Sequence, residues 1–141
     1  MEPNAIDDLL ARHAVLFAAH DAAGLAAQHA PEGTFSSPAA GVVTGRRAIE
    51  QVYRYWFTAF PDMRFTWRPP LAQGNRVALF WSFSGSLQGP FFGVTVPGAR
   101  VQMSGAAEYT LSDEGIATAD HLFDFSQVLI KAGVMKIKPT S

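Results

Sequence analysis

The stretch Gly115-Ile-Ala-Thr-Ala-Asp-His-Leu-Phe-Asp-Phe-Ser-Gln-Val-Leu-Ile-Lys-Ala-Gly133 changes its hydrophobic period from two residues to about 3.6 at Asp124. The period of two over residues 116–123 predicts a strand with Ala117, Ala119, His121 and Phe123 on one face and Ile116, Thr118, Asp120 and Leu122 on the other. Asp124 is a favoured helix N-cap, so a short helix is expected over residues 125–132, closed by Gly133. The segment therefore predicts a last strand that runs into a helix and carries His121 on its small and apolar face.

Upstream of this segment, the sequence predicts helices first and strands afterwards. Helical spacing of apolar residues, with Asn4, Asp21 and Gly45 at the starts, predicts helices over residues 4–20, 21–29 and 45–60. Residues 34–36 are expected to be briefly extended, and residues 37–41 to form a loop. Alternation predicts strands over residues 63–67, 76–85 and 101–111, with a hairpin turn at residues 112–115. This order is typical of an α+β fold in which a curved antiparallel sheet wraps over N-terminal helices.

Composition predicts one domain over residues 1–141, with a core from about residue 4 to residue 133 and a peripheral tail over residues 134–141. Hydrophobic residues make up 48% of the chain and charged residues 16%, which favours a lined cavity or a subunit interface. The net charge of −1 and the scattered basic residues predict no nucleic-acid partner. Since no apolar run approaches membrane-spanning length, we expect no membrane partner and a cytoplasmic location. The absence of cysteine excludes disulfides and thiolate chemistry.

Four further short motifs occur in a recognisable order. They are Gly45-Arg46-Arg47-Ala48-Ile49, Phe60-Pro61-Asp62, the Gly-rich run from Gly85 to Gly93, and Gly98-Ala99-Arg100-Val101. Together with the strand-to-helix ending at Asp124, they resemble SnoaL-like polyketide cyclases of the nuclear transport factor 2-like superfamily, over about residues 4 to 133. The resemblance implies a cone-shaped sheet with a pocket between sheet and helices. It also implies a homodimer through the outer sheet face, where Phe80 and Leu122 are expected.

Two enzyme types of this superfamily lack their acids here. In the ketosteroid isomerase pattern, His13 takes the place of the oxyanion-hole Tyr and Ser37 that of the base, and no Asp occurs between Asp62 and Asp113. In the limonene epoxide hydrolase pattern, the required Arg and Asp of the middle strand fall on Trp81 and Phe83, and the last-strand Asp falls on His121. Neither reaction is therefore expected.

The cyclase pattern retains proton-active residues. Its acid/base Asp corresponds to His121, and its assisting His falls on Tyr109, one register away from Glu108. Histidine is a competent acid/base near neutral pH, and a Tyr hydroxyl can stabilise an enolate oxygen. The resemblance thus implies His121, Tyr109 and Glu108 as catalytic candidates. The plainer interpretation makes His121 a core histidine, Glu108 a surface charge and Asp124 a helix cap only.

The remaining candidates are pocket-lining residues for a hydrophobic small-molecule ligand: His13, His20, Ser37, Phe57, Trp67, Trp81, Phe83 and Phe123. Several of these also suit a plain core. No metal site is expected, because three histidines would have to converge without any Cys. Two functions remain open. One is a cofactor-independent acid/base enzyme for aldol-type cyclisation or isomerisation of a flat apolar carbonyl compound, and the other is a non-catalytic ligand-binding or interaction domain.

Overall fold

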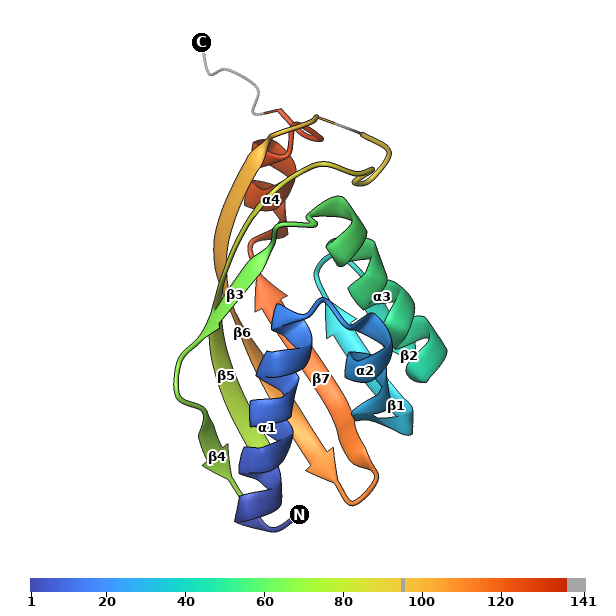
Figure 1. The fold of residues 1–141 in the computed structure, drawn as a ribbon, viewed down its shortest axis with the longest axis vertical. Helices are drawn as coiled ribbons and strands as arrows, with labels where there is room; N and C mark the ends of the chain where they lie inside the picture. Colours follow the sequence, from blue (N-terminus) through green and yellow to red (C-terminus); the bar gives the residue numbers. More distant parts are fainter. Residues whose placement is uncertain (95, 137–141) are drawn as a thin grey trace.

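The computed structural model describes residues 1–94 and 96–136, and Figure 1 shows helices packed on one side of a curved sheet. The predicted tail lies outside the described residues from residue 137 onward. The helices are α1 (Pro3–Ala18), α2 (Ala22–Ala27), α3 (Arg46–Ala59) and α4 (Phe125–Lys131). The strands are β1 (His29–Ser37), β2 (Gly41–Thr44), β3 (Arg64–Trp67), β4 (Leu71–Gln73), β5 (Arg76–Ser86), β6 (Arg100–Ser112) and β7 (Gly115–Phe123). The predicted α+β class is confirmed.

The sheet follows the order β2-β1-β7-β6-β5-β3, and β4 pairs with the end of β5. All neighbouring strands are antiparallel except β1 and β7, which run parallel. The sheet is curved and not closed, and α1, α2 and α3 cover its concave face while α4 lies at one end (Figure 1). The predicted antiparallel meander of β5, β6 and β7 is confirmed. The parallel pairing of β1 with β7 is an addition that the sequence did not indicate.

Element boundaries differ from the predictions near the N-terminus. The first helix begins at Pro3 rather than after Asn4, and the N-cap position is Glu2, whose side chain makes no cap hydrogen bond. Proline suits this place because the first helical N–H groups have no partner within the helix. The second helix ends at Ala27, and residues from His29 onward form β1 through long-range pairing with β7. The sequence did not predict β2 or β4, because both strands are short.

The strand-to-helix segment forms nearly as expected. The Asp124 side chain accepts a hydrogen bond from the backbone N–H of Gln127 at 3.2 Å, and Gly133 takes a φ of 81° after the helix, so the cap and the end of α4 are confirmed. A register shift in the pairing of β6 with β7 interrupts the alternation at Ala117. As a result Ile116 is buried, contrary to its predicted outward placement, while Ala119 and His121 are buried as predicted.

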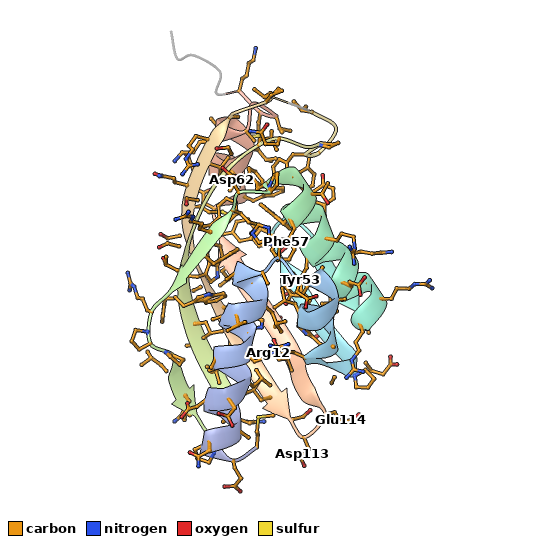
Figure 2. The ribbon with its side chains drawn as sticks, viewed as in Figure 1. Arg12, Tyr53, Phe57, Asp62, Asp113 and Glu114 are labelled. Carbon is orange, nitrogen blue, oxygen red and sulfur yellow. The ribbon has the colours of Figure 1, made fainter. Side chains whose placement is uncertain are left out.

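An aromatic core fills the space between the helices and the sheet. Tyr53 and Phe57 of α3 project into this space (Figure 2), and both side chains are buried. On the sheet, the indole of Trp81 lies over Gly105, where a Cβ would collide with the ring. Each buried aromatic side chain contributes about 1.5–3 kcal/mol to stability. The core therefore fixes the inner surface on which the candidate site is built.

Candidate active site

An apolar cavity lies between α3 and the concave face of the sheet. It has about 60 Å³ of space for the centres of water-sized molecules. Its walls are Phe17, Phe35, Ser37, Val52, Tyr53, Trp56, Phe57, Met63, Phe65, Trp81, Met103, His121 and Phe123. Because a water molecule needs roughly 10–15 Å³ of such space, the cavity as it stands admits only a few waters. Side chains at its wall must move before a multi-ring ligand can enter.

Five predicted site residues meet at this cavity. They are Ser37, Phe57, Trp81, His121 and Phe123. The structure does not bring Trp67, Phe83 or His20 to the same wall. Trp67 packs on His13 and Phe17, Phe83 packs on Trp56 and Phe60, and His20 stacks on Phe57 with its Nε2 3.0 Å from the carbonyl oxygen of Met63. Phe83 is buried in the core, whereas Trp67 and His20 are half-buried at its edge.

Glu108 lies on the opposite, outer face of the sheet. Its carboxylate accepts a hydrogen bond from Arg76 at 2.7 Å, and its side chain is 49% exposed. Tyr109, the next residue, points inward and is fully buried, because side chains alternate along β6. Of the two neighbours that the sequence left open for His121, Tyr109 is the one present, and Glu108 is the surface charge of the plainer interpretation, so it is no catalytic candidate.

Tyr109 and His121 share the inner face of neighbouring strands. The backbone pairs Tyr109 with Ala119, and Ala107 with His121, so the two side chains are diagonal neighbours. The Tyr109 hydroxyl lies 3.4 Å from Nε2 of His121 and 2.9 Å from Nε2 of His13, which projects from α1. Nδ1 of His13 lies 2.7 Å from Oε1 of Gln28. These four residues form a chain of side-chain contacts from helix to cavity, which we call the relay.

The direction of donation along the relay follows from its Gln28 end. The Gln28 amide nitrogen donates to the carbonyl oxygen of Leu9 at 3.1 Å, so Oε1 is the atom that accepts from Nδ1 of His13. A neutral His13 then accepts at Nε2 from the Tyr109 hydroxyl, and the Tyr109 oxygen is free to accept from Nε2–H of His121. Nδ1 of His121 has no hydrogen-bond partner among residues 1–94 and 96–136, and the ring lines the cavity.

Burial keeps these imidazoles neutral. Desolvation, followed by repulsion from His13 and His29, lowers the pKa of His121 from 6.5 to about 3. Desolvation also lowers the pKa of His13 to about 4, although the hydrogen bond to Gln28 opposes the shift. Burial raises the pKa of Tyr109 above its ordinary value of 10.0. Near neutral pH the relay is therefore uncharged, and His121 offers the cavity a lone pair.

A second polar pair, His29 and Tyr53, lies beside the relay. Nε2 of His29 is 2.9 Å from the Tyr53 hydroxyl, and burial lowers the pKa of His29 to about 3. Two buried atoms lack a hydrogen-bond partner within the described part of the chain: Nδ1 of His29 and Nε1 of Trp81. Since Trp81 lines the cavity, a ligand oxygen is a natural partner for its indole N–H.

Sequence reasoning missed Gln28, His29 and Tyr53 as site residues. Tyr53 was visible only as one member of the apolar stripe of a helix. Gln28 and His29 carried no local signal, because their partners lie at least 15 residues away. The structure is what assigns them to the site.

One known protein family matches most of this chain. A profile of the family described as SnoaL-like polyketide cyclase matches residues 7–130. The chain belongs to the SnoaL-like polyketide cyclase family. Curated proteins gave no match. Within residues 1–94 and 96–136, none of the chain's helices has the length and apolar character needed to span a membrane.

Solved structures share the fold of this SnoaL-like chain at low identity. TsrD from Streptomyces laurentii is 19% identical with a TM-score of 0.81, covering 96% of this chain and 99% of its own. A Catenulispora acidiphila protein with a ketosteroid isomerase-like fold, solved with trimethylamine, is 19% identical with a TM-score of 0.74, covering 90% and 93%. TerC, co-crystallised with polyporic acid, is 18% identical with a TM-score of 0.72, covering 89% and 96%. At these identities the likeness establishes the fold alone.

Proposed function

We propose that the protein is a small-molecule enzyme that performs acid/base chemistry without a cofactor on a flat, apolar carbonyl compound. The reaction is an aldol-type cyclisation or an isomerisation. One observation carries the proposal: His121 lines an apolar cavity, its Nε2 faces Tyr109, and its Nδ1 is left without a protein partner among the described residues. A positioned imidazole in an otherwise apolar cavity is the usual form of a general base.

The proposed step is proton transfer from carbon. Nδ1 of His121 takes a proton from the carbon next to the substrate carbonyl, and the C–H electron pair becomes the enolate. The imidazolium and the enolate are formed together in a cavity of low polarity, where their attraction is strong. The indole N–H of Trp81, a wall residue whose Nε1 has no hydrogen-bond partner among the described residues, is our candidate donor to the enolate oxygen. His121 then returns the proton, to a second carbon in an isomerisation or to the new alkoxide in an aldol cyclisation.

The cavity lining supports the proposed substrate class. Its side chains are aromatic or aliphatic apart from Ser37, His121 and the polar atoms of Tyr53 and Trp81. Such a wall favours a compound with flat apolar rings and few polar atoms. Polyporic acid, the compound co-crystallised with TerC, is a reasonable first probe for binding.

The test compares two matched variants on a panel of aromatic and polycyclic carbonyl compounds. We expect His121→Asn to lower turnover on the order of a hundredfold, the usual contribution of a positioned acid/base, while the fold is retained. Glu108→Gln, on the outer sheet face, is the control and should retain full turnover. If folded His121→Asn turns over substrate at the wild-type rate, or if Glu108→Gln loses activity instead, the proposed role of His121 is wrong.

A non-catalytic ligand-binding domain is the second candidate, and one observation favours it. The burial that lowers the pKa of His121 to about 3 makes its charged form costly, and Nε2 of His121 is already engaged with Tyr109. A protein of that kind would bind members of the same panel tightly without converting any of them. Its affinity would survive His121→Asn with little change.

A further inference from the structure

Gln28 stands at the junction of two helices, as the C-cap residue of α2 in contact with α1. Its amide nitrogen donates to the carbonyl oxygen of Leu9, and its amide oxygen accepts from His13. It is half-buried and lies at the end of the relay opposite to His121. No step of the proposed reaction uses it directly.

The four relay residues differ in whether their hydrogen-bonding roles are reversible. A neutral imidazole carries its proton on either nitrogen, and a hydroxyl donates in one direction while it accepts from another. His13, Tyr109 and His121 therefore allow two opposite directions of donation. Gln28 does not, because its NH₂ group only donates and its oxygen only accepts. The Leu9 carbonyl settles which of them faces His13.

The two directions of donation along the relay leave Nδ1 of His121 in different protonation states at the cavity. With Gln28 accepting, His13 holds its proton on Nδ1, Tyr109 donates to His13, and His121 keeps its proton on Nε2. In the reversed direction His13 donates from Nε2 to Tyr109, Tyr109 donates to His121, and the His121 proton moves to Nδ1. The first arrangement presents an acceptor to a ligand, and the second presents a donor.

We infer that Gln28 is a positioning residue that holds His121 in the Nε2–H tautomer through His13 and Tyr109, and so keeps Nδ1 as the proton acceptor of the cavity. The tautomer assignment stands on the hydrogen bonds alone. Its consequence for turnover rests on the proposed function. A histidine in the wrong tautomer loses most of its value as a base even where its position is unchanged.

The experiment is nitrogen NMR of the ligand-free protein labelled with ¹⁵N-histidine, in which protonated and bare imidazole nitrogens give well-separated signals. The His121→Asn variant assigns the His121 pair. In the wild type we expect His121 protonated at Nε2 and His13 at Nδ1. Gln28→Met keeps the length of the side chain but removes the amide, so a proton on Nδ1 of His13 would be buried without a partner. We expect the His121 tautomer ratio to shift on the order of tenfold toward Nδ1–H.

The matched control is Gln127→Met, on the exposed surface of α4, which should leave the spectrum of His121 unchanged. If Gln28→Met does not fold, Tyr109→Phe provides the second variant, because it disconnects His121 from Gln28 and should release the tautomer in the same way. A wild-type His121 protonated at Nδ1 overturns the inference. So does a single wild-type tautomer that persists in the folded Gln28→Met or Tyr109→Phe protein.

A kinetic measurement separates this inference from the proposed function. On a substrate found in the panel, Gln28→Met should lower kcat about as far as it depletes the Nε2–H tautomer, on the order of tenfold, with little change in KM. If Gln28→Met shifts the tautomer ratio of His121 but leaves kcat unchanged, Gln28 still sets the tautomer, and the proposed role of His121 as the base is wrong.

Discussion

Acidification should destabilise this protein strongly between pH 6.5 and pH 5. His13, His29 and His121 have pKa values lowered to between about 3 and about 4 in the folded state, against an ordinary value of 6.5 when unfolded. A depressed folded pKa means that the unfolded chain binds protons first, so the stability contribution is complete above pH 6.5 and is lost as the pH falls toward the folded pKa. At pH 5 the folded histidines are still neutral.

The magnitude follows from the same values. One pKa unit corresponds to about 1.36 kcal/mol, so at pH 5 each buried histidine removes about 2 kcal/mol from the free energy of unfolding. Three such residues together remove about 6 kcal/mol, which is comparable to the whole stability of a typical domain. Asp62 and Asp124 do not interfere, because their pKa values are lowered from 3.8 and both carboxylates stay ionised above pH 5.

Urea unfolding at constant ionic strength, repeated at pH 7, 6 and 5, measures this loss directly. His121→Gln removes one of the three titrating groups, so its stability should fall with pH about two-thirds as steeply as that of the wild type. The slope is the informative quantity, because the substitution also changes stability at pH 7. A free energy of unfolding that stays constant between pH 7 and pH 5 would refute the reasoning, as would equal slopes in the two proteins.

Two further predictions concern the sheet. Gly105→Ala places a Cβ against the indole of Trp81, so we expect a loss of about 1–3 kcal/mol in urea unfolding and a changed near-UV circular dichroism spectrum; equal stability would show that the ring has room to move. On the outer face, Phe80 and Leu122 are 38% and 72% exposed, and we propose that this face forms a homodimer. Leu122→Lys should then sediment as the 15.2 kDa monomer while Val15→Lys on α1 remains dimeric, and a monomeric wild type would remove the proposal.

Local signals in the sequence predicted local structure well. Asp124 marks the change of period because its own side chain caps the following helix, and Gly133 ends that helix with a positive φ. Strand β1 was predicted only in part, because Pro31 and Gly33 near its start are residue types that strands disfavour. Pairing with the distant β7 is what makes this segment a strand. Long-range pairing of this kind leaves no periodic trace in the segment itself.

The candidate site, like the fold, could be predicted where the signals were local and could not be predicted where they were long-range. Alternation and the position of Asp124 were enough to place His121 on the inner face, where it is buried at the cavity. The sequence could not decide whether Glu108 or Tyr109 faces His121. The register of β6 is set by pairing with both neighbouring strands, and its pairing with β7 includes a shift near Ala117. The role of Gln28 depends on contacts across 15 and 19 residues, which no motif encodes.

His121 stands where the resemblance to the cyclases places an acid/base Asp, and this difference changes which ligands the cavity stabilises. A carboxylate base is charged before the substrate arrives, whereas the buried His121 is neutral and becomes charged only when it takes a proton. In a cavity this apolar the imidazolium is stable only beside a newly formed anion. A ligand that cannot yield such an anion next to Nδ1 is therefore held by its apolar surface and neutral hydrogen bonds, without an ion pair. Under the proposed function, a ligand that is only bound and one that is converted would differ in one property, the acidity of the C–H group that each presents to His121.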